Sequence, residues 1–372
     1  MQLVRSFTSS ALRPYERGAE FGSHHTDEIA RNVAAYRRLF AARATGRFDV
    51  EEWARHAWHA IGSQAPWAVE EITGIAHGAG VPVHEIAALN ARTELLAIAN
   101  PTGVLECSTV VSLPPDGSPV ACQTWDWYQA MADGWLVWTI PLPDGGEITT
   151  LTEHGVLGKI GVGAGGVGVL FNKLHHVADA GGTGGAGGAA EQLGYPLHLL
   201  CRRILETAAD TAAAVEMARR VRVSASSAVT VVDTAGRAVS LELFPGGTGI
   251  AEPIDGLLVR TNHFIAAEGR AGCLAHTIGE GSEIRRRTLL SELAGSPPGS
   301  SGPVLEAMHD HADVGGVCAH PDPALEPVLQ HATLATVVID VESRSLRVTP
   351  WGPCARHEAA TTAADVRTSG RT

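Results

Sequence analysis

Cysteine is sparse in this sequence, since a chain of 372 residues contains six of them. They are Cys107, Cys122, Cys201, Cys273, Cys318 and Cys354. No two stand in the CxxC spacing of zinc fingers and redox motifs, and they are too few for a disulfide framework. We therefore expect most of them to be small, buried hydrophobic residues.

Positive charge and long apolar runs are also scarce. The chain has 28 Lys and Arg against 40 Asp and Glu, for a formal net charge of −12. It has no dense basic stripe with interleaved aromatic residues, which argues against a nucleic-acid partner. No run reaches the roughly 18 apolar residues that cross a bilayer, and the first residues lack the apolar centre of a signal peptide. We expect a cytoplasmic protein with a small-molecule partner and no membrane partner.

The residues that are present indicate a folded, layered domain. Hydrophobic residues make up 45% of the chain and charged residues 18%, which is usual for globular proteins. Apolar residues recur at helical spacing over about 26–100, 195–221 and 282–293. Elsewhere, β-type runs such as STVVSL, WLVWTI, AVTVVD and LATVVIDV alternate with Gly- and Pro-containing turns. Consecutive runs of each type predict stacked layers, followed by a disordered tail from about 356 to 372.

Glycine is concentrated in two segments. The sequence AGGTGGAGGAA, residues 180–190, predicts a mobile loop that is either a surface insertion or a lid over a binding site. Gly161, Gly163 and Gly166 satisfy a GxGxxG pattern. However, VGVLFN follows them and is typical of a strand, whereas a dinucleotide site needs a helix there. We interpret the segment as a β-hairpin that turns at 164–166, which argues against a dinucleotide-dependent oxidoreductase.

Metal-ligating residue types gather in the segment HDHADVGGVCAH. It contains His309, His311, Asp313, Cys318 and His320. Their spacing matches no zinc pattern. We interpret this segment as a polar loop near the surface, and we expect neither a bound metal nor another cofactor.

Cys107 stands where a Pro-containing loop meets the first strand, in NPTGVLECSTVVSL. A cysteine in this place is either a buried packing residue or a nucleophile. Residue type and position alone leave both interpretations open.

An ordered series of motifs runs along most of the chain. PYERGAEFG (14–22), ECSTVV (106–111) and QTWDW (123–127) come first, and GKIGVGAGGVGVLFNKL, ASSAVTVVD, RTNHF and TLATVVIDVESRSLRVTPWGPC follow. Together they resemble, in the same order, the acyl-coenzyme A:6-aminopenicillanic acid acyltransferase family, also called isopenicillin-N acyltransferase-like proteins. The resemblance implies an N-terminal-nucleophile hydrolase fold of the α+β class, a four-layer αββα sandwich.

The same resemblance implies that the chain cuts itself between Glu106 and Cys107. The thiol attacks the preceding carbonyl, the acyl group moves from nitrogen to sulfur, and hydrolysis of this thioester frees a new N-terminus. A helical chain 1–106 and a sheet-rich chain 107–372 then remain associated in one αββα domain. The new α-amine, with an ordinary pKa of about 7.7–8, serves as the base for the thiol, so no separate catalytic His or Lys is required.

Further site residues follow from motif position. The resemblance implies that Asp126 orients groups around Cys107, that Ser227 contacts the new amine or the nucleophile, and that Asn262 donates to the oxyanion. From residue type alone, each also fits a turn, a cap or a strand hydroxyl. The residues implied in substrate binding are Trp125, Asn172 and His263.

We therefore expect an amidohydrolase that acts on a small N-acyl or peptide-like amide through an acyl-Cys107 thioester. Two alternatives stay open: an acyltransferase with an acyl-coenzyme A or an amine as co-substrate, and a non-processing, small-molecule-binding homologue. The second arises because Glu106 stands where the family often has Gly, and because 329–331 replace the family's Ser-Arg pair. In a third departure from the family, Thr124 replaces the Asn before Trp-Asp. We expect hydrolysis to dominate over transfer, because the Gly-rich loop suggests an open site.

Overall fold

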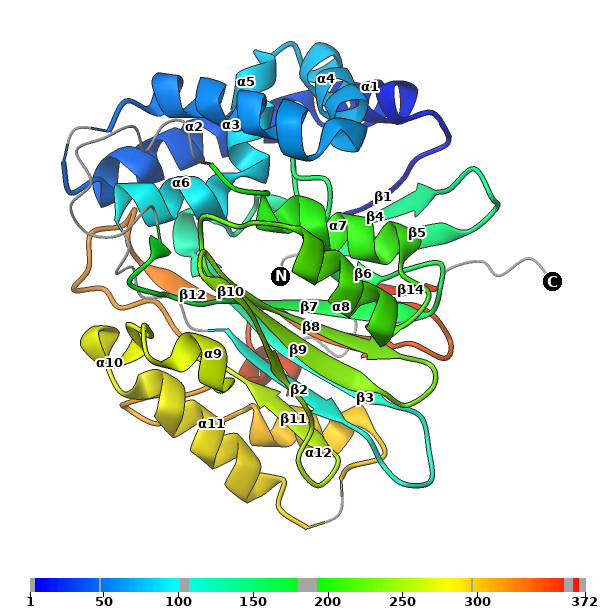
Figure 1. Cartoon of the computed structure of the whole chain (residues 1–372), viewed down its shortest axis with the longest axis vertical. Helices are drawn as coiled ribbons and strands as arrows, with labels where there is room; N and C mark the ends of the chain where they lie inside the picture. Colours follow the sequence, from blue (N-terminus) through cyan, green and yellow to red (C-terminus); the bar gives the residue numbers. More distant parts are fainter. Residues whose placement is uncertain are drawn as a thin grey trace.

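Two β-sheets lie face to face at the centre of the computed structural model (Figure 1). The described residues are 4–46, 48–100, 107–179, 193–295, 297–357 and 364–367. Cross-sheet contacts of β2 with β7, and of β12 and β13 with β6, form the interface between the sheets. All neighbouring strands are antiparallel except the parallel pair β1 and β4.

The larger sheet has eight strands and the smaller sheet has six. In spatial order, the larger sheet contains β1 (Ser6–Thr8), β4 (Trp135–Pro141), β5 (Glu147–Glu153), β6 (Ile160–Val162), β7 (Val167–Lys173), β8 (Ser227–Asp233), β9 (Ala238–Phe244) and β10 (Gly247–Ala251). The smaller sheet contains β11 (Leu257–Arg260), β2 (Ser108–Ser112), β3 (Val120–Tyr128), β12 (His331–Asp340), β13 (Ser345–Pro350) and β14 (Ala364–Arg367). Every residue of β2, β3, β7, β8 and β9 is buried, because both faces of each sheet are covered.

Helices cover the outer faces of the sheets. Their bounds are α1 (Pro14–His24), α2 (Thr26–Arg43), α3 (Val50–Gln64), α4 (Val69–Ala79), α5 (Val83–Asn90), α6 (Arg92–Ala99), α7 (Leu197–Thr207), α8 (Thr211–Arg220), α9 (Ala267–Arg270), α10 (Ala275–Ile278), α11 (Gly281–Glu292) and α12 (Ser301–Ala307). Short 3-10 helices are η1 (Pro66–Ala68), η2 (Gln129–Met131) and η5 (Pro353–His357). Helices α7 and α8 pack on the larger sheet, α11 and α12 pack on the smaller one, and α1–α6 gather at one end (Figure 1). This arrangement confirms the αββα sandwich.

Helices α1 and α4 pack at very close range because of small residues in both. A Cβ atom at Gly18 would lie 2.2 Å from the carbonyl oxygen of Glu71, and one at Gly74 would lie 2.1 Å from that of Tyr15. Any side chain at these positions would push the helices apart. The PYERGAEFG motif is therefore a helix-packing motif in this chain.

The segments before and after Cys107 are joined by buried ion pairs. Arg17 and Arg202 both contact the Glu71 carboxylate, at 2.7 and 3.1 Å, and so join α1, α4 and α7. Arg92 pairs with Glu153 and joins α6 to β5. Removing one member of such a pair leaves an unpaired buried charge, at a cost of about 3–5 kcal/mol. The two segments also share one continuous hydrophobic core, so they form a single folding unit.

Two predicted elements can be compared with the structure. The GxGxxG segment is a hairpin between β6 and β7, as expected: the Gly163 amide donates to the Val167 carbonyl at 2.8 Å, and Gly166 has a left-handed φ of 75°. The helix predicted over 195–221 is instead two helices, α7 and α8. Asp210 interrupts it because its side chain caps α8 by accepting from the Ala213 amide at 2.8 Å.

The remaining expectations concern the Gly-rich segment, the C-terminal tail and membrane-spanning helices. The Gly-rich segment 180–190 lies outside the described residues. In the tail, where we expected disorder from about 356, Ala364–Arg367 is strand β14 and pairs with β13. Among the helices described, none combines the length and the hydropathy needed to cross a bilayer.

Candidate active site

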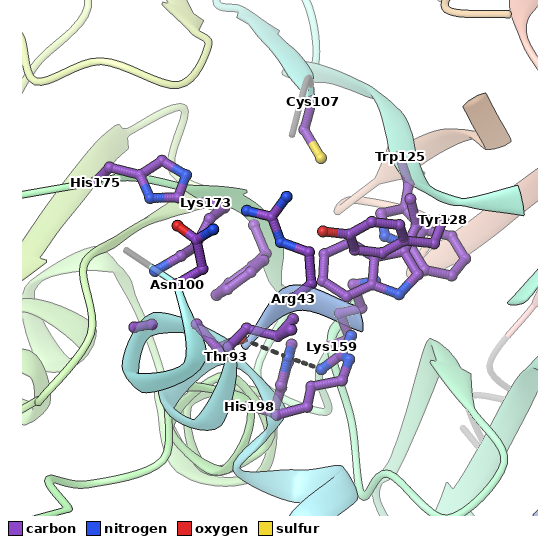
Figure 2. A pocket seen from close by; sticks show the side chains of 15 residues that line it. Arg43, Thr93, Asn100, Cys107, Trp125, Tyr128, Lys159, Lys173, His175 and His198 are labelled. Carbon is purple, nitrogen blue, oxygen red and sulfur yellow. Dashed lines mark hydrogen bonds between the residues drawn. The ribbon is translucent and has the colours of Figure 1, made fainter. Parts of the chain in front are cut away.

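The Cys107 side chain lines a pocket between the N-terminal helices and the sheets (Figure 2). Cys107 is buried and lies directly before β2. Helices α2 and α6 form one side of the pocket, and β3 and β7 form the other. The Cys107 thiol donates to the main-chain carbonyl of Asp126, with an S···O distance of 3.5 Å. This arrangement places a potential nucleophile at the wall of a small-molecule pocket.

The thiol is not ionised in the uncleaved chain at neutral pH. Burial raises the pKa of Cys107 to about 12, and the nearby Asp126 carboxylate adds to this rise. The positive charges of Lys159 and Arg285 oppose the rise in pKa. Attack by Cys107 therefore requires a base that accepts the thiol proton.

The backbone of Cys107 is held from two sides. Its carbonyl oxygen accepts from the Asn172 amide nitrogen at 3.0 Å and from Arg285 Nη1 at 3.2 Å. The Asn172 side chain is itself fixed, because its oxygen accepts from the Thr109 hydroxyl at 2.8 Å. Asn172 thus positions the backbone of the nucleophile. Of the three residues implied in substrate binding, it alone forms a hydrogen bond with Cys107 within the described part of the chain.

Asn262 belongs to the same network but reaches Cys107 through Arg285. Its side-chain oxygen accepts from Arg285 Nη2 at 3.1 Å, and its Nδ2 donates to the Lys173 carbonyl at 2.9 Å. Because Nδ2 carries two hydrogens, this bond occupies one of them. In the role predicted for Asn262, the second hydrogen would donate to the oxyanion.

Asp126 lies beside the nucleophile on β3. Its carboxylate is buried and accepts from the Thr333 hydroxyl at 2.6 Å, across the β3–β12 pair. Strand alternation places this carboxylate on the opposite face of β3 from Trp125 and Trp127, which line the pocket. Asp126 therefore contacts the Cys107 thiol through its main chain, while its charge acts on the thiol pKa.

Ser227 and His263 are held in contacts of their own. The Ser227 hydroxyl donates to the Ser226 carbonyl at 2.7 Å, and Ser227 pairs with Lys173 in the sheet. His263 Nδ1 lies 2.8 Å from the Ser282 hydroxyl, and burial lowers the pKa of its imidazole to about 3. His263 is therefore neutral, and neither residue is among those that line the Cys107 pocket.

The pocket wall combines aromatic rings with buried positive charge. Lys159 Nζ lies 3.3 Å from the ring centroid of Trp125 and 3.5 Å from Glu153. Burial, together with the charge of Arg92, lowers the pKa of Lys159 to about 7 although Glu153 opposes this shift. Lys159 can therefore gain or lose a proton near neutral pH, close to the nucleophile.

Comparison with known proteins finds similarity to one acyltransferase family. The family model described as acyl-coenzyme A:6-aminopenicillanic acid acyl-transferase matches residues 187–320. The acyl-coenzyme A:6-aminopenicillanic-acid-acyltransferase 40 kDa form of Emericella nidulans is 29% identical over 265 residues, which are 69% of this chain and 68% of that protein. The chain is therefore similar to this acyltransferase family. This similarity identifies it as an enzyme of the class that transfers acyl groups or hydrolyses amide bonds.

Solved structures give weaker likenesses. An N-acylethanolamine-hydrolyzing acid amidase orthologue from Caenorhabditis elegans is 14% identical, with a TM-score of 0.43 over 70% of this chain and 100% of that one. Penicillin V acylase from Agrobacterium tumefaciens is 15% identical, with a TM-score of 0.45 over 66% and 83% of the two chains. These scores add nothing to the fold assignment, which rests on the sheets and helices of this chain.

Sequence reasoning missed two cations of this site. Lys159 lies in the glycine-rich hairpin segment, which we interpreted from its glycines alone. A lysine inside the apolar run GKIGV could have indicated a buried charge. Arg285 lies in the sequence EIRRR on α11, which resembles a solvent-facing helix surface. Its burial follows only from the packing of α11 on the smaller sheet.

Proposed function

We propose that this chain is a self-processing amidohydrolase that cleaves a small N-acyl or peptide-like amide through an acyl thioester on Cys107. The observation that carries the proposal is the placement of Cys107 directly before β2. Its side chain lines a pocket, and its carbonyl is held by Asn172 and Arg285. After cleavage Cys107 would be a chain end, and these two hydrogen bonds would keep its backbone in place for catalysis.

In the proposed self-cleavage, Cys107 supplies both the attacking sulfur and the departing amide nitrogen. The Cys107 sulfur attacks the carbonyl carbon of the preceding peptide bond, and the amide nitrogen of Cys107 leaves that carbon as it takes up a proton. Water then hydrolyses the resulting thioester, which releases a carboxylate at 106 and a free thiol and α-amine at Cys107. Since the thiol pKa is about 12 before cleavage, proton removal from sulfur is the demanding part of this step.

Turnover repeats the same steps on a substrate. The Cys107 α-amine accepts the thiol proton, sulfur attacks the amide carbonyl, and the proton passes to the departing amine. Water then attacks the thioester and yields the carboxylic acid and the free thiol. The Asn262 amide is the proposed donor to the oxyanion in both halves, and Lys159 and Arg285 contribute positive charge near the sulfur.

Charge in the pocket favours a substrate with a carboxylate or a similar anion. Arg43, at the end of α2, lines the pocket with Trp125 and Tyr128. Its Nη2 is buried and makes no hydrogen bond within the described residues, whereas Lys159 already faces Glu153. A buried guanidinium nitrogen without a partner is a natural site for an anionic oxygen.

Transfer to an amine is the second candidate, and the family match is the observation that favours it. Our preference for hydrolysis came from the Gly-rich segment 180–190, which lies outside the described residues. Hydrolysis as the dominant fate of the acyl group therefore stays a prediction, as does a cytoplasmic location.

The proposed function is tested with two chromogenic anilides that differ only in a free carboxylate or its methyl ester. Quenched reactions should show the 107–372 chain heavier by one acyl group, attached at Cys107. We expect kcat/KM to be about tenfold or more higher for the carboxylate, because a hydrogen bond to a charged group contributes about 1.5–3 kcal/mol. Competing amines at rising concentration should divert only a minor part of the acyl group.

The matched variant for this experiment is Arg43→Met, which should remove the preference for the carboxylate and leave the ester rate within about twofold. An acyl group found on another residue would contradict the thioester proposal. Saturable diversion to an amine, with a defined KM for that amine, would show an acceptor site and replace hydrolysis by transfer.

A further inference from the structure

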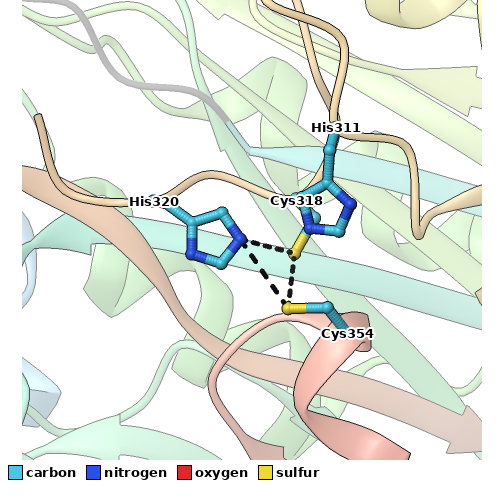
Figure 3. Close-up of side chains that lie close together, drawn as sticks. All are labelled: His311, Cys318, His320 and Cys354. Atoms are coloured by element: carbon cyan, nitrogen blue, oxygen red, sulfur yellow. Dashed lines mark hydrogen bonds between the residues drawn. The ribbon is translucent and has the colours of Figure 1, made fainter.

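Four metal-ligating side chains meet near the start of β12, and none of them is among the residues that line the Cys107 pocket. His311, Cys318 and His320 come from the segment between α12 and β12, and Cys354 comes from η5 (Figure 3). One ligand atom from each residue lies within 4.8 Å of all the others. Cys318 is buried, Cys354 is half-buried and both histidines are exposed, so an ion could reach the cluster from solvent. We propose that these four residues bind one zinc ion as a structural Cys2His2 site.

The distances fit the edges of a zinc tetrahedron. The two sulfur atoms lie 3.4 Å apart, and His320 Nε2 lies 4.0 Å from the sulfur of Cys318 and 3.7 Å from that of Cys354. Zinc bonds of about 2.3 Å to sulfur and 2.0–2.1 Å to nitrogen give tetrahedral edges of about 3.8 Å between sulfurs and about 3.5 Å between sulfur and nitrogen. These three separations therefore lie within about 0.5 Å of the edges expected around zinc, and a ring nitrogen of His311 lies within 4.8 Å of each of the other ligand atoms.

The ligand set also fits zinc chemically. Two thiolates and two imidazoles form a closed four-ligand set, which is typical of structural zinc sites. Binding releases the protons of both thiols, since zinc takes cysteine as thiolate. Both cysteines are free, and their sulfur separation exceeds the roughly 2.05 Å of a disulfide bond.

The loop before β12 and the segment around Gly352 pack closely against each other at this cluster. The segment from Met308 to Gln330 contains no helix or strand among the described elements, and a loop of this length is uncommon without a fixing contact. Gly352 lies two residues before Cys354, and a Cβ atom there would come within 2.2 Å of the Cys318 sulfur. A zinc ion would tie this loop to the C-terminal segment.

The cluster also lies next to residues that position Asp126. The neighbour of Cys318, Ala319, exchanges two bonds with Thr333: its amide donates to the Thr333 hydroxyl at 3.0 Å, and its carbonyl accepts from the Thr333 amide at 3.0 Å. The same hydroxyl donates to Asp126 at 2.6 Å. Loss of zinc should therefore loosen the support of Asp126 as well as the loop.

The test measures metal in the enzyme expressed from the whole 372-residue sequence, purified with a thiol reductant and then incubated with Zn²⁺ and desalted. We expect about one zinc per enzyme molecule by elemental mass spectrometry, and below about 0.1 per molecule in Cys318→Ser and Cys354→Ser. Cys273→Ser, at a half-buried cysteine outside the cluster, is the matched control and should keep the metal. Replacement by Co²⁺ should give the visible bands of a tetrahedral site and a thiolate charge-transfer band.

A second readout uses unmodified enzyme, so it does not depend on how the variants fold. Zinc should slow alkylation of Cys318 and Cys354, and a chelator should restore alkylation and lower Tm reversibly. Three results would overturn the proposal: zinc-incubated wild type with little metal, equal metal in both cysteine variants and wild type, or a Cys318–Cys354 disulfide in the reductant-treated protein.

Discussion

Cys107→Ala is expected to leave one uncleaved chain without turnover. Cys107→Ser should process slowly and lose roughly 10³-fold or more of kcat, the scale of losing a nucleophile. A hydroxyl can still carry out the acyl shift, but it is far less ionised than a thiol, and burial already raises the pKa of Cys107 to about 12. Denaturing gels follow processing, and anilide hydrolysis follows turnover.

The control for this pair is Cys201→Ala on α7. Cys201 is also fully buried with its pKa raised to about 12 by burial, but it does not line the pocket. We expect this variant to process normally and to keep its turnover within about twofold at a temperature where it is folded, since only packing is changed. Wild-type activity in Cys107→Ala would remove Cys107 from the mechanism.

Asn262→Ala should slow acylation and deacylation together, each by about 10²–10³-fold, because both steps pass through an oxyanion at the same carbon. The change also frees Arg285 Nη2 from its bond to the Asn262 oxygen, so the carbonyl of Cys107 should be held less firmly. Pre-steady-state kinetics separate the two steps by the rate of the burst and the rate of the following phase.

Gln330→Ala is a suitable control because it removes an amide outside the pocket that bonds only to the Leu325 carbonyl in the described contacts. It should leave both phases within about twofold. A loss confined to one phase in Asn262→Ala would show that Asn262 does not serve a shared oxyanion.

The fold was largely predictable because its elements carry strong local signals. The strand after Cys107 and the hairpin at 164–166 follow from β-branched runs and from glycines that turn the chain. The break between α7 and α8 was missed because a cap at Asp210 competes with helical spacing that continues on both sides of it. Apolar spacing shows where a helix can form, and a single polar contact decides where it ends.

The site was less predictable, because its contacts join residues that are distant in sequence. Motif position led to Asn172 and Asn262, but not to Arg285, which links Asn262 to the carbonyl of the nucleophile. The four-residue cluster was missed for the same reason, since Cys354 lies 36 residues after Cys318. The spacing of residues in a sequence can identify metal ligands within one loop. It cannot identify a ligand that a distant segment contributes.

The central claim, that Cys107 becomes the N-terminal nucleophile of an associated second chain, is tested most directly by intact mass spectrometry of the active protein under native and denaturing conditions. We predict one native species that separates on denaturation into chains of residues 1–106 and 107–372. The buried pairs of Arg202 with Glu71 and of Arg92 with Glu153 link the two chains and should keep them together until then. An active protein whose only denatured species is the full-length chain would contradict the account.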